Sequence, residues 1–156
     1  MSDHNIPKNA KEAFSVSALK TVAGVIGEVE KHTSAEIRVS ILEERDTTDA
    51  NLPIADVARK EFFRLGMEKT SGHNGVLLLI LFHERKFYIV GDQGIHDRLH
   101  PETWEDVAAT LKSHFAHGKF TEGVVEGLQK IKQHLHTALP ASQNDVNELT
   151  NEVSIR

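Results

Sequence analysis

Residues 76–82 form an unbroken run of seven apolar side chains, and this run constrains the fold more than any other part of the chain. A run of this length suits a central strand that is covered on both faces, as in α/β sheets. Polar residues interrupt the pattern at 83–85, and residues 86–90 resume it with β-branched and aromatic side chains. We therefore predict a buried hairpin at the centre of the domain.

Apolar spacing around this hairpin predicts one further strand and four helices. Residues 35–42 alternate between apolar and polar side chains, which is typical of a strand with one buried face. Apolar residues recur at helical spacing within 19–29, 54–65, 104–115 and 124–135. The predicted order is helix, strand, helix, strand, strand, helix, helix. The predicted fold class is an α/β sandwich, in which helices flank a small mixed sheet.

The length of 156 residues fits one domain, which we place at residues 14–139. A flexible N-terminal arm at 1–13 and a flexible, polar C-terminal tail at 140–156 are expected to flank it. The net charge of -5 comes without a basic stripe, so nucleic acid is not an expected partner. The chain has no cysteine, which excludes thiolate chemistry. No segment resembles a secretory signal or a membrane span, and we expect a cytoplasmic protein.

Polar residues are expected to converge at one end of the sheet. A strand-helix-strand crossover makes its two strands parallel, so strands 35–42 and 76–82 begin at the same end. The strand at 86–90 ends there, because it runs back along its hairpin partner. Glycines at this end let backbone approach a ligand closely. The candidate ligand-binding residues are Thr33, Glu36, Thr70, Asn74, Gly91, Asp92, Gln93, Gly94 and His96.

Three carboxylates at the same end are candidate metal ligands. Glu36, Asp92 and Asp97 could supply oxygen atoms to Ca²⁺ or Mg²⁺, the cations that prefer such ligands. The alternative is that Asp92 only caps the loop after the third strand, as aspartate does in many turns. The sequence leaves both interpretations open.

Four motifs resemble those of the TPM domain family. They are Thr-Ser-Ala-Glu-Ile-Arg-Val at 33–39, Asn-Gly-Val-Leu-Leu at 74–78, Gly-Asp-Gln-Gly-Ile at 91–95 and Phe-x-x-Gly-x-Phe-x-x-Gly at 115–123. Their order and spacing match the family over roughly residues 14–139. The chain is most similar to a short bacterial subgroup that has neither a signal peptide nor a transmembrane segment.

Two functions are expected, one implied by the resemblance and one by the residues at the converging end. Some members of the family have been linked to acid phosphatase activity and divalent-cation binding, which implies a cation-dependent phosphoester hydrolase. The hairpin turn is acidic in much of the family, whereas this chain has His83, Glu84 and Arg85 there. The converging end carries no evident nucleophile, which favours a non-catalytic domain that binds a protein partner. We carry both hypotheses forward.

Overall fold

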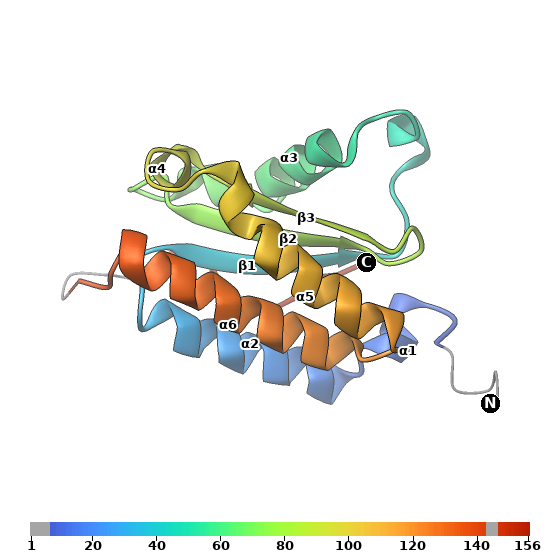
Figure 1. The fold of residues 1–156 in the computed structure, drawn as a ribbon. Coiled ribbons are helices and arrows are strands. Elements are labelled where there is room, and N and C mark those ends of the chain that lie inside the picture. Colours follow the sequence, from blue (N-terminus) through green and yellow to red (C-terminus); the bar gives the residue numbers. More distant parts are fainter. Residues whose placement is uncertain (1–6, 143–146) are drawn as a thin grey trace.

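The computed structural model describes residues 7–142 and 147–156 (Figure 1). The α-helices are α1 (Ala10–Ala13), α2 (Val16–Glu30), α3 (Ile54–Arg64), α4 (Gln93–His96), α5 (Glu105–Ala116) and α6 (Phe120–Ala138). The 3₁₀ turns are η2 (Thr47–Asp49), η3 (Met67–Lys69) and η4 (Pro101–Trp104). The strands are β1 (Glu36–Leu42), β2 (Gly75–Leu81), β3 (Lys86–Gly91) and β4 (Ser154–Ile155). The predicted α/β class and the order of the long elements are confirmed.

The sheet is mixed, with the strand order β3-β2-β1-β4. β1 and β2 are parallel, and β2 and β3 form an antiparallel hairpin. This arrangement confirms the predicted crossover and the predicted hairpin. Arg85 closes the hairpin turn with a φ of 55°, in the left-handed region. At the other edge, β4 pairs with β1.

Helices cover both faces of the sheet (Figure 1). α2, α5 and α6 lie on one face, where alternate residues such as Val76, Leu78 and Ile80 join their core. α3 lies on the other face, against Leu77 and Leu79. Every residue of β2 is buried, which confirms it as the central strand. Each such aliphatic side chain contributes about 1.5–3 kcal/mol to stability, so the hairpin is the scaffold of the domain.

Short-range signals explain where the long helices begin and end. The Ser15 hydroxyl accepts a hydrogen bond of 3.1 Å from the Ala18 backbone N–H and caps α2. Gly118 follows α5 with a φ of 71°, the left-handed conformation that favours glycine after a helix. Among the described residues, no helix is both long and apolar enough to span a membrane.

Three short elements lie where the sequence predicts none. Helix α4 occupies the predicted loop after β3, and α1 lies within the predicted N-terminal arm, where Ala10 is buried. The predicted flexible tail contains β4, and Arg156 extends this pairing by donating a 3.0 Å hydrogen bond from its backbone N–H to the Ile41 carbonyl. Such short segments carry too few residues for apolar periodicity to reveal them. Residues 1–6 and 143–146 of the predicted arm and tail lie outside the described residues.

Candidate functional site

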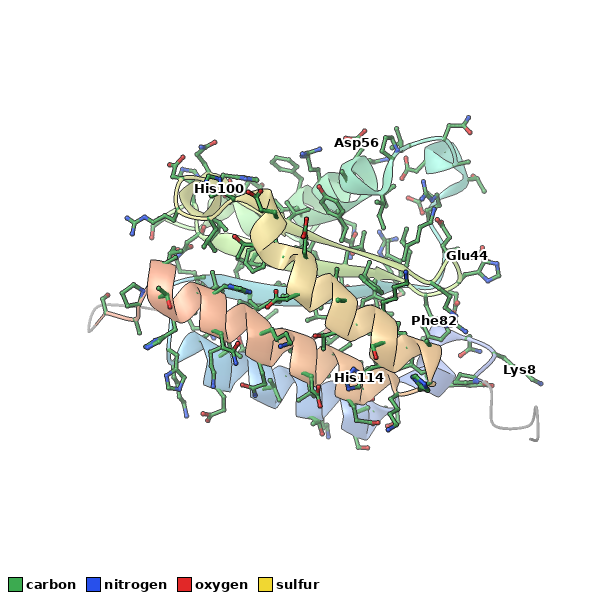
Figure 2. All side chains as sticks on the ribbon, in the orientation of Figure 1. Lys8, Glu44, Asp56, Phe82, His100 and His114 are labelled. Carbon is green, nitrogen blue, oxygen red and sulfur yellow. The ribbon has the colours of Figure 1, made fainter. Side chains whose placement is uncertain are left out.

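Three strands meet at the predicted end of the sheet, where β1 and β2 begin and β3 ends. The Glu36 backbone N–H donates to the Asn74 carbonyl at 3.0 Å, and the Asp92 backbone N–H donates to the Gly75 carbonyl at 2.9 Å. Figure 2 shows His100 near this end and Phe82 and Glu44 toward the opposite end. The structure thus brings the start of β1, the start of β2 and the end of β3 together.

Thr33 joins this end of the sheet to the end of α6. Its hydroxyl donates a 2.6 Å hydrogen bond to the Leu139 carbonyl and accepts one of 3.2 Å from the Ala35 backbone N–H. The Ser34 backbone N–H also donates to the Leu139 carbonyl, at 3.0 Å. Thr33 is only 1% exposed, so its side chain holds these two segments together and does not face solvent.

Thr70 and Asn74 shape the turn that precedes β2. The Asn74 backbone N–H donates a 3.1 Å hydrogen bond to the Thr70 hydroxyl. The Asn74 side-chain amide donates to the Ser34 carbonyl at 2.5 Å and so connects the starts of β1 and β2. The Asn74 Oδ1 atom is buried and has no hydrogen-bond partner among the described residues. This oxygen is therefore one acceptor at this end that the fold does not use.

Asp92 caps the short helix α4. Its Oδ1 atom accepts a 2.8 Å hydrogen bond from the Gln93 backbone N–H. Its buried Oδ2 atom makes no hydrogen bond to the described residues, and the imidazole Nδ1 of His73 lies 3.6 Å away. The Gln93 side-chain amide donates to Asp97 Oδ1 at 2.8 Å, and exposed His96 ends α4. The geometry matches the turn-capping interpretation of Asp92.

The glycines at this end are required by protein packing. A methyl group at Gly91 would lie 2.7 Å from Ile95 Cγ2, and one at Gly94 would lie 2.7 Å from the carbonyl oxygens of Gly72 and His73. The Gly94 backbone N–H donates a 2.8 Å hydrogen bond to the His73 carbonyl. Both glycines let the loop after β3 lie directly on neighbouring protein atoms.

Glu36 lies in a separate cavity of about 350 Å³ that also contains Glu30. Glu36 is 4% exposed, and its Oε1 atom accepts a 2.5 Å hydrogen bond from the Glu148 backbone N–H. Glu30 Oε2 accepts a 2.9 Å hydrogen bond from the Ile37 backbone N–H. Burial and the neighbouring Glu36 carboxyl together raise the pKa of Glu30 to about 8, against the opposing effect of the Ile37 hydrogen bond. Glu30 is not among the predicted site residues, because it lies in helix α2 and not beside a strand end.

The three predicted metal ligands do not form one cluster. Among residues 7–142 and 147–156, no group of three or more His, Cys, Asp or Glu side chains could hold a metal ion. Glu36 and Asp92 are separated by Gly75 on β2, which places their Cα atoms about 10 Å apart, two strand spacings. A methyl group at Gly75, between them, would lie 3.2 Å from the Met67 carbonyl oxygen and 3.3 Å from Phe62 Cζ. These carboxylates do not fit a single Ca²⁺ or Mg²⁺ ion.

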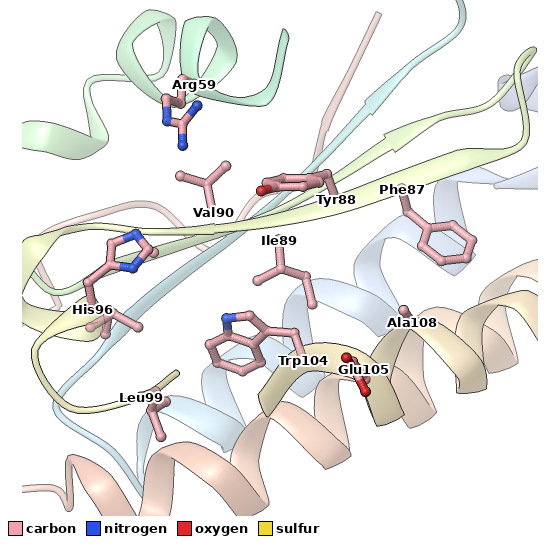
Figure 3. A pocket seen from close by; sticks show the side chains of 12 residues that line it. Arg59, Phe87, Tyr88, Ile89, Val90, His96, Leu99, Trp104, Glu105 and Ala108 are labelled. Carbon is pink, nitrogen blue, oxygen red and sulfur yellow. The ribbon is translucent and has the colours of Figure 1, made fainter. Parts of the chain in front are cut away.

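A groove of about 330 Å³ runs along β3, the outermost strand of the sheet (Figure 3). Arg59 on α3 stands on one side of the strand, with Tyr88 and Val90. Trp104 stands on the other side, with Ile89 and Phe87. The lining also includes Ile95, Leu99, Glu105, Ala108 and two predicted residues, Gly91 and His96.

The sequence does not predict this groove. Trp104 and Arg59 belong to helices that lie far apart in the chain, and they face each other only because β3 is the outer strand. Helical spacing assigns Trp104 to the core, yet its side chain is only half-buried and lines the groove. The only signal in the sequence is a large aromatic residue just after a proline-initiated turn.

Comparisons with known proteins agree with the fold. The BA42 protein from the psychrophilic bacterium Bizionia argentinensis, solved by NMR, is similar at a TM-score of 0.84 and 29% identity, over 96% of this chain and 100% of that chain. The N-terminal domain of a P. gingivalis protein, also solved by NMR, shares the fold at a TM-score of 0.64 and 21% identity, over 80% of this chain and 78% of that one. No curated protein matches. The model of the TPM domain matches residues 9–134, and the chain therefore belongs to the TPM domain family.

Proposed function

We propose that this TPM domain is a non-catalytic binding module, and that a protein partner docks in the groove along β3. The observation that carries the proposal is the half-buried apolar surface of the groove. Phe87, Ile89 and Trp104 all present part of their side chains to solvent there. Aromatic side chains that combine large apolar area with few rotatable bonds are enriched at the centres of protein interfaces.

The polar end of the sheet supports a non-catalytic role. Thr33, Asn74 and Asp92 all use side-chain atoms to join backbone segments. A nucleophilic mechanism needs an activated hydroxyl, thiol, amine or carboxylate beside a base. The Thr33 hydroxyl donates its proton to a carbonyl oxygen, which cannot act as that base. The hydrogen bonds at this end therefore have a structural explanation.

The test is selection of binders from a random peptide library displayed on phage, followed by binding assays with purified protein. Ala108→Arg is the diagnostic variant, because Ala108 is exposed and lines the groove. Ala109→Arg is the matched control, since Ala109 is exposed on the same helix outside the groove. We expect selected peptides to bind the wild type and the control and to lose at least about tenfold in affinity for Ala108→Arg, or 1.4 kcal/mol. Equal binding to both variants would contradict the proposal.

A second candidate function is divalent-cation-dependent hydrolysis of phosphoesters. The observation in its favour is that Asp92 Oδ2 and Asn74 Oδ1 are buried acceptors without a hydrogen-bond partner among the described residues. Such oxygens suit a hard cation. Turnover of p-nitrophenyl phosphate with Mg²⁺, Ca²⁺ or Mn²⁺, sustained at acid or neutral pH and abolished by Asp92→Asn, would support this function over the first. Its absence under all these conditions would exclude it.

A further inference from the structure

We infer that the groove along β3 binds an extended peptide, which adds to the sheet as a further strand. This inference rests on the proposed binding function and specifies the conformation and chemistry of the partner segment. It is carried by three features of the groove: unpaired backbone groups, two walls that enclose the strand edge, and opposite chemistry on those walls.

The outer edge of β3 carries backbone groups that no described strand pairs with. The Asp92 backbone N–H donates to the Gly75 carbonyl, which makes these two residues a hydrogen-bonded pair of the antiparallel ladder. Since such pairs alternate, Val90 and Tyr88 direct their N–H and C=O groups toward β2. Phe87 and Ile89 direct theirs away from the sheet, into the groove. A single extended chain can satisfy these four groups.

The edge is recessed between two walls. Arg59 on α3 stands on one side of β3, and Trp104 and Ala108 stand on the other (Figure 3). A second copy of the domain would have to bring both of its own walls, α3 and α5, up to this edge together with its β3. A lone strand of about 10 Å thickness from side chain to side chain enters such a groove without this obstacle. The occupant is therefore an extended segment of another polypeptide.

The walls differ in chemistry, which specifies the side chains of the segment. Successive residues of an added strand point to opposite faces of the sheet. Those on the α5 side would meet Ile89, Leu99 and Trp104, which favour apolar side chains, and exposed Glu105 on the same wall disfavours an acidic one there. Those on the α3 side would meet exposed Arg59, whose one ion pair among the described residues is a 3.2 Å contact with half-buried Asp56. An acidic residue there would complement the guanidinium group. The expected ligand alternates apolar residues with acidic ones.

The test uses a blocked ten-residue peptide in which valine alternates with glutamate and threonine, added to uniformly ¹⁵N-labelled protein. Hydrogen exchange measured by NMR is the decisive readout. We expect the Phe87 and Ile89 amides to exchange at least about tenfold more slowly with saturating peptide. The Tyr88 and Val90 amides already face β2 and are expected to change little. This alternation is specific to strand addition.

Charge reversal supplies a second readout that does not depend on the core. Arg59→Glu is expected to reduce the affinity for the glutamate peptide at least about fivefold. It should raise the affinity for a second peptide in which lysine replaces glutamate. Arg64→Glu and Lys60→Glu are not suitable controls, because Arg64 pairs with buried Glu61 and Lys60 pairs with buried Asp49. Lys112→Glu on α5 serves instead, since Lys112 is exposed and does not line the groove, and equal loss in Arg59→Glu and Lys112→Glu would overturn the assignment of Arg59.

Several outcomes would overturn strand addition and leave the binding function standing. One is a selected peptide whose binding is lost in Ala108→Arg but which slows hydrogen exchange of the Phe87, Tyr88, Ile89 and Val90 amides equally. Another is protection of the Phe87 and Ile89 amides in the free protein that becomes stronger as the protein concentration rises. This result would identify a second copy as the occupant. If no selected peptide depends on Ala108, the proposed function itself fails.

Discussion

Arg156 Nη2 lies 2.9 Å from Glu61 Oε1, and this ion pair ties the C-terminal strand β4 to helix α3. The Glu61 side chain is only 1% exposed. It also accepts a 2.6 Å hydrogen bond from Arg64 and a short one from the Ser40 hydroxyl. Burial acts to raise the pKa of Glu61, but the hydrogen bonds from Arg64, Ser40 and Arg156 outweigh it and lower the pKa from 4.5 to about 2.

The ionised form of Glu61 is therefore expected to stabilise the fold at neutral pH. Because its pKa is lower in the folded state, this contribution is complete above pH 4.5 and is lost as the pH falls toward 2. Glu61→Gln should reduce the free energy of unfolding at pH 7 by about 2–3 kcal/mol, toward the low end because both arginines are partly exposed. The difference from wild type should shrink between pH 4.5 and 2 in urea titrations.

The control for this experiment is Glu44→Gln, because Glu44 is exposed at the same end of the sheet. Its stability should follow the wild-type curve at every pH. Faster exchange of the Arg156 backbone amide, which donates to the Ile41 carbonyl, would report loosening of β4 in Glu61→Gln. A constant difference between Glu61→Gln and wild type from pH 7 to 2 would show that the lost stability does not come from the charge of Glu61.

The contribution of Glu30 to stability depends on pH in the opposite direction to that of Glu61. Its pKa is raised to about 8 in the folded state, so its contribution to stability is complete below pH 4.5 and is lost as the pH rises through 8. Glu30→Gln stays neutral and keeps an oxygen acceptor for the Ile37 backbone N–H. We expect it to be about 2 kcal/mol more stable than wild type at pH 9 and to lack the decline between pH 5 and 9.

Exposed Glu28 on the same helix provides the comparison for Glu30. It pairs only with Lys31 at 2.8 Å among the described residues, so Glu28→Gln should keep the wild-type slope of stability against pH. Unfolding in urea, followed by the fluorescence of the single tryptophan, measures all three proteins. A wild-type stability that is flat from pH 5 to 9 would contradict the raised pKa of Glu30.

The sequence predicts the centre of this fold better than its edges. Seven consecutive apolar residues identify β2, and the crossover rule then brings Asn74 and Asp92 to one end without any structural information. These inferences succeed because they depend on long, strongly patterned segments. β4 was missed because two residues carry no detectable period, although buried Glu61 holds Arg156 beside it.

The candidate site was harder to predict than the fold. Residue types and strand ends place Thr33, Asn74 and Asp92 at one end of the sheet, but hydrogen-bond partners decide what their side chains do. The sequence does not reveal those partners, because Leu139 and Ser34 accept through their backbone carbonyls, and every residue type has one. The groove likewise depends on the lateral order of the strands, which places β3 at the edge.

Gly94 and Gly24 form a matched pair for testing why glycines gather near β3. A methyl group at Gly94 would lie 2.7 Å from two backbone carbonyl oxygens, whereas one at Gly24 in α2 would meet nothing within 4 Å. Gly94→Ala should reduce the free energy of unfolding by about 2 kcal/mol or more, because backbone atoms must move. Gly24→Ala should raise it by about 0.5–1 kcal/mol, since alanine favours helix. Thermal unfolding measures both, and a neutral Gly94→Ala would refute the packing explanation.

Asp92 can be tested as a helix cap and as a cation ligand in the same series. Asparagine caps a helix about as well as aspartate, so Asp92→Asn should keep the wild-type free energy of unfolding, whereas Asp92→Ala should lose about 1 kcal/mol. The Oδ1 atom that accepts from the Gln93 backbone N–H is present in aspartate and in asparagine. The two substitutions therefore separate the hydrogen bond from the charge.

The same proteins answer the cation question when ¹⁵N-labelled samples are titrated with Ca²⁺, Mg²⁺ and Zn²⁺. If Asp92 acts only as a cap, amide shifts near Asn74 and Asp92 should stay below those of the exposed carboxylates at Glu44 and Glu102. Saturable shifts centred on Asp92, lost in Asp92→Asn at unchanged stability, would require a bound cation there. The buried Oδ2 atom would then be its ligand, and the capping interpretation would be incomplete.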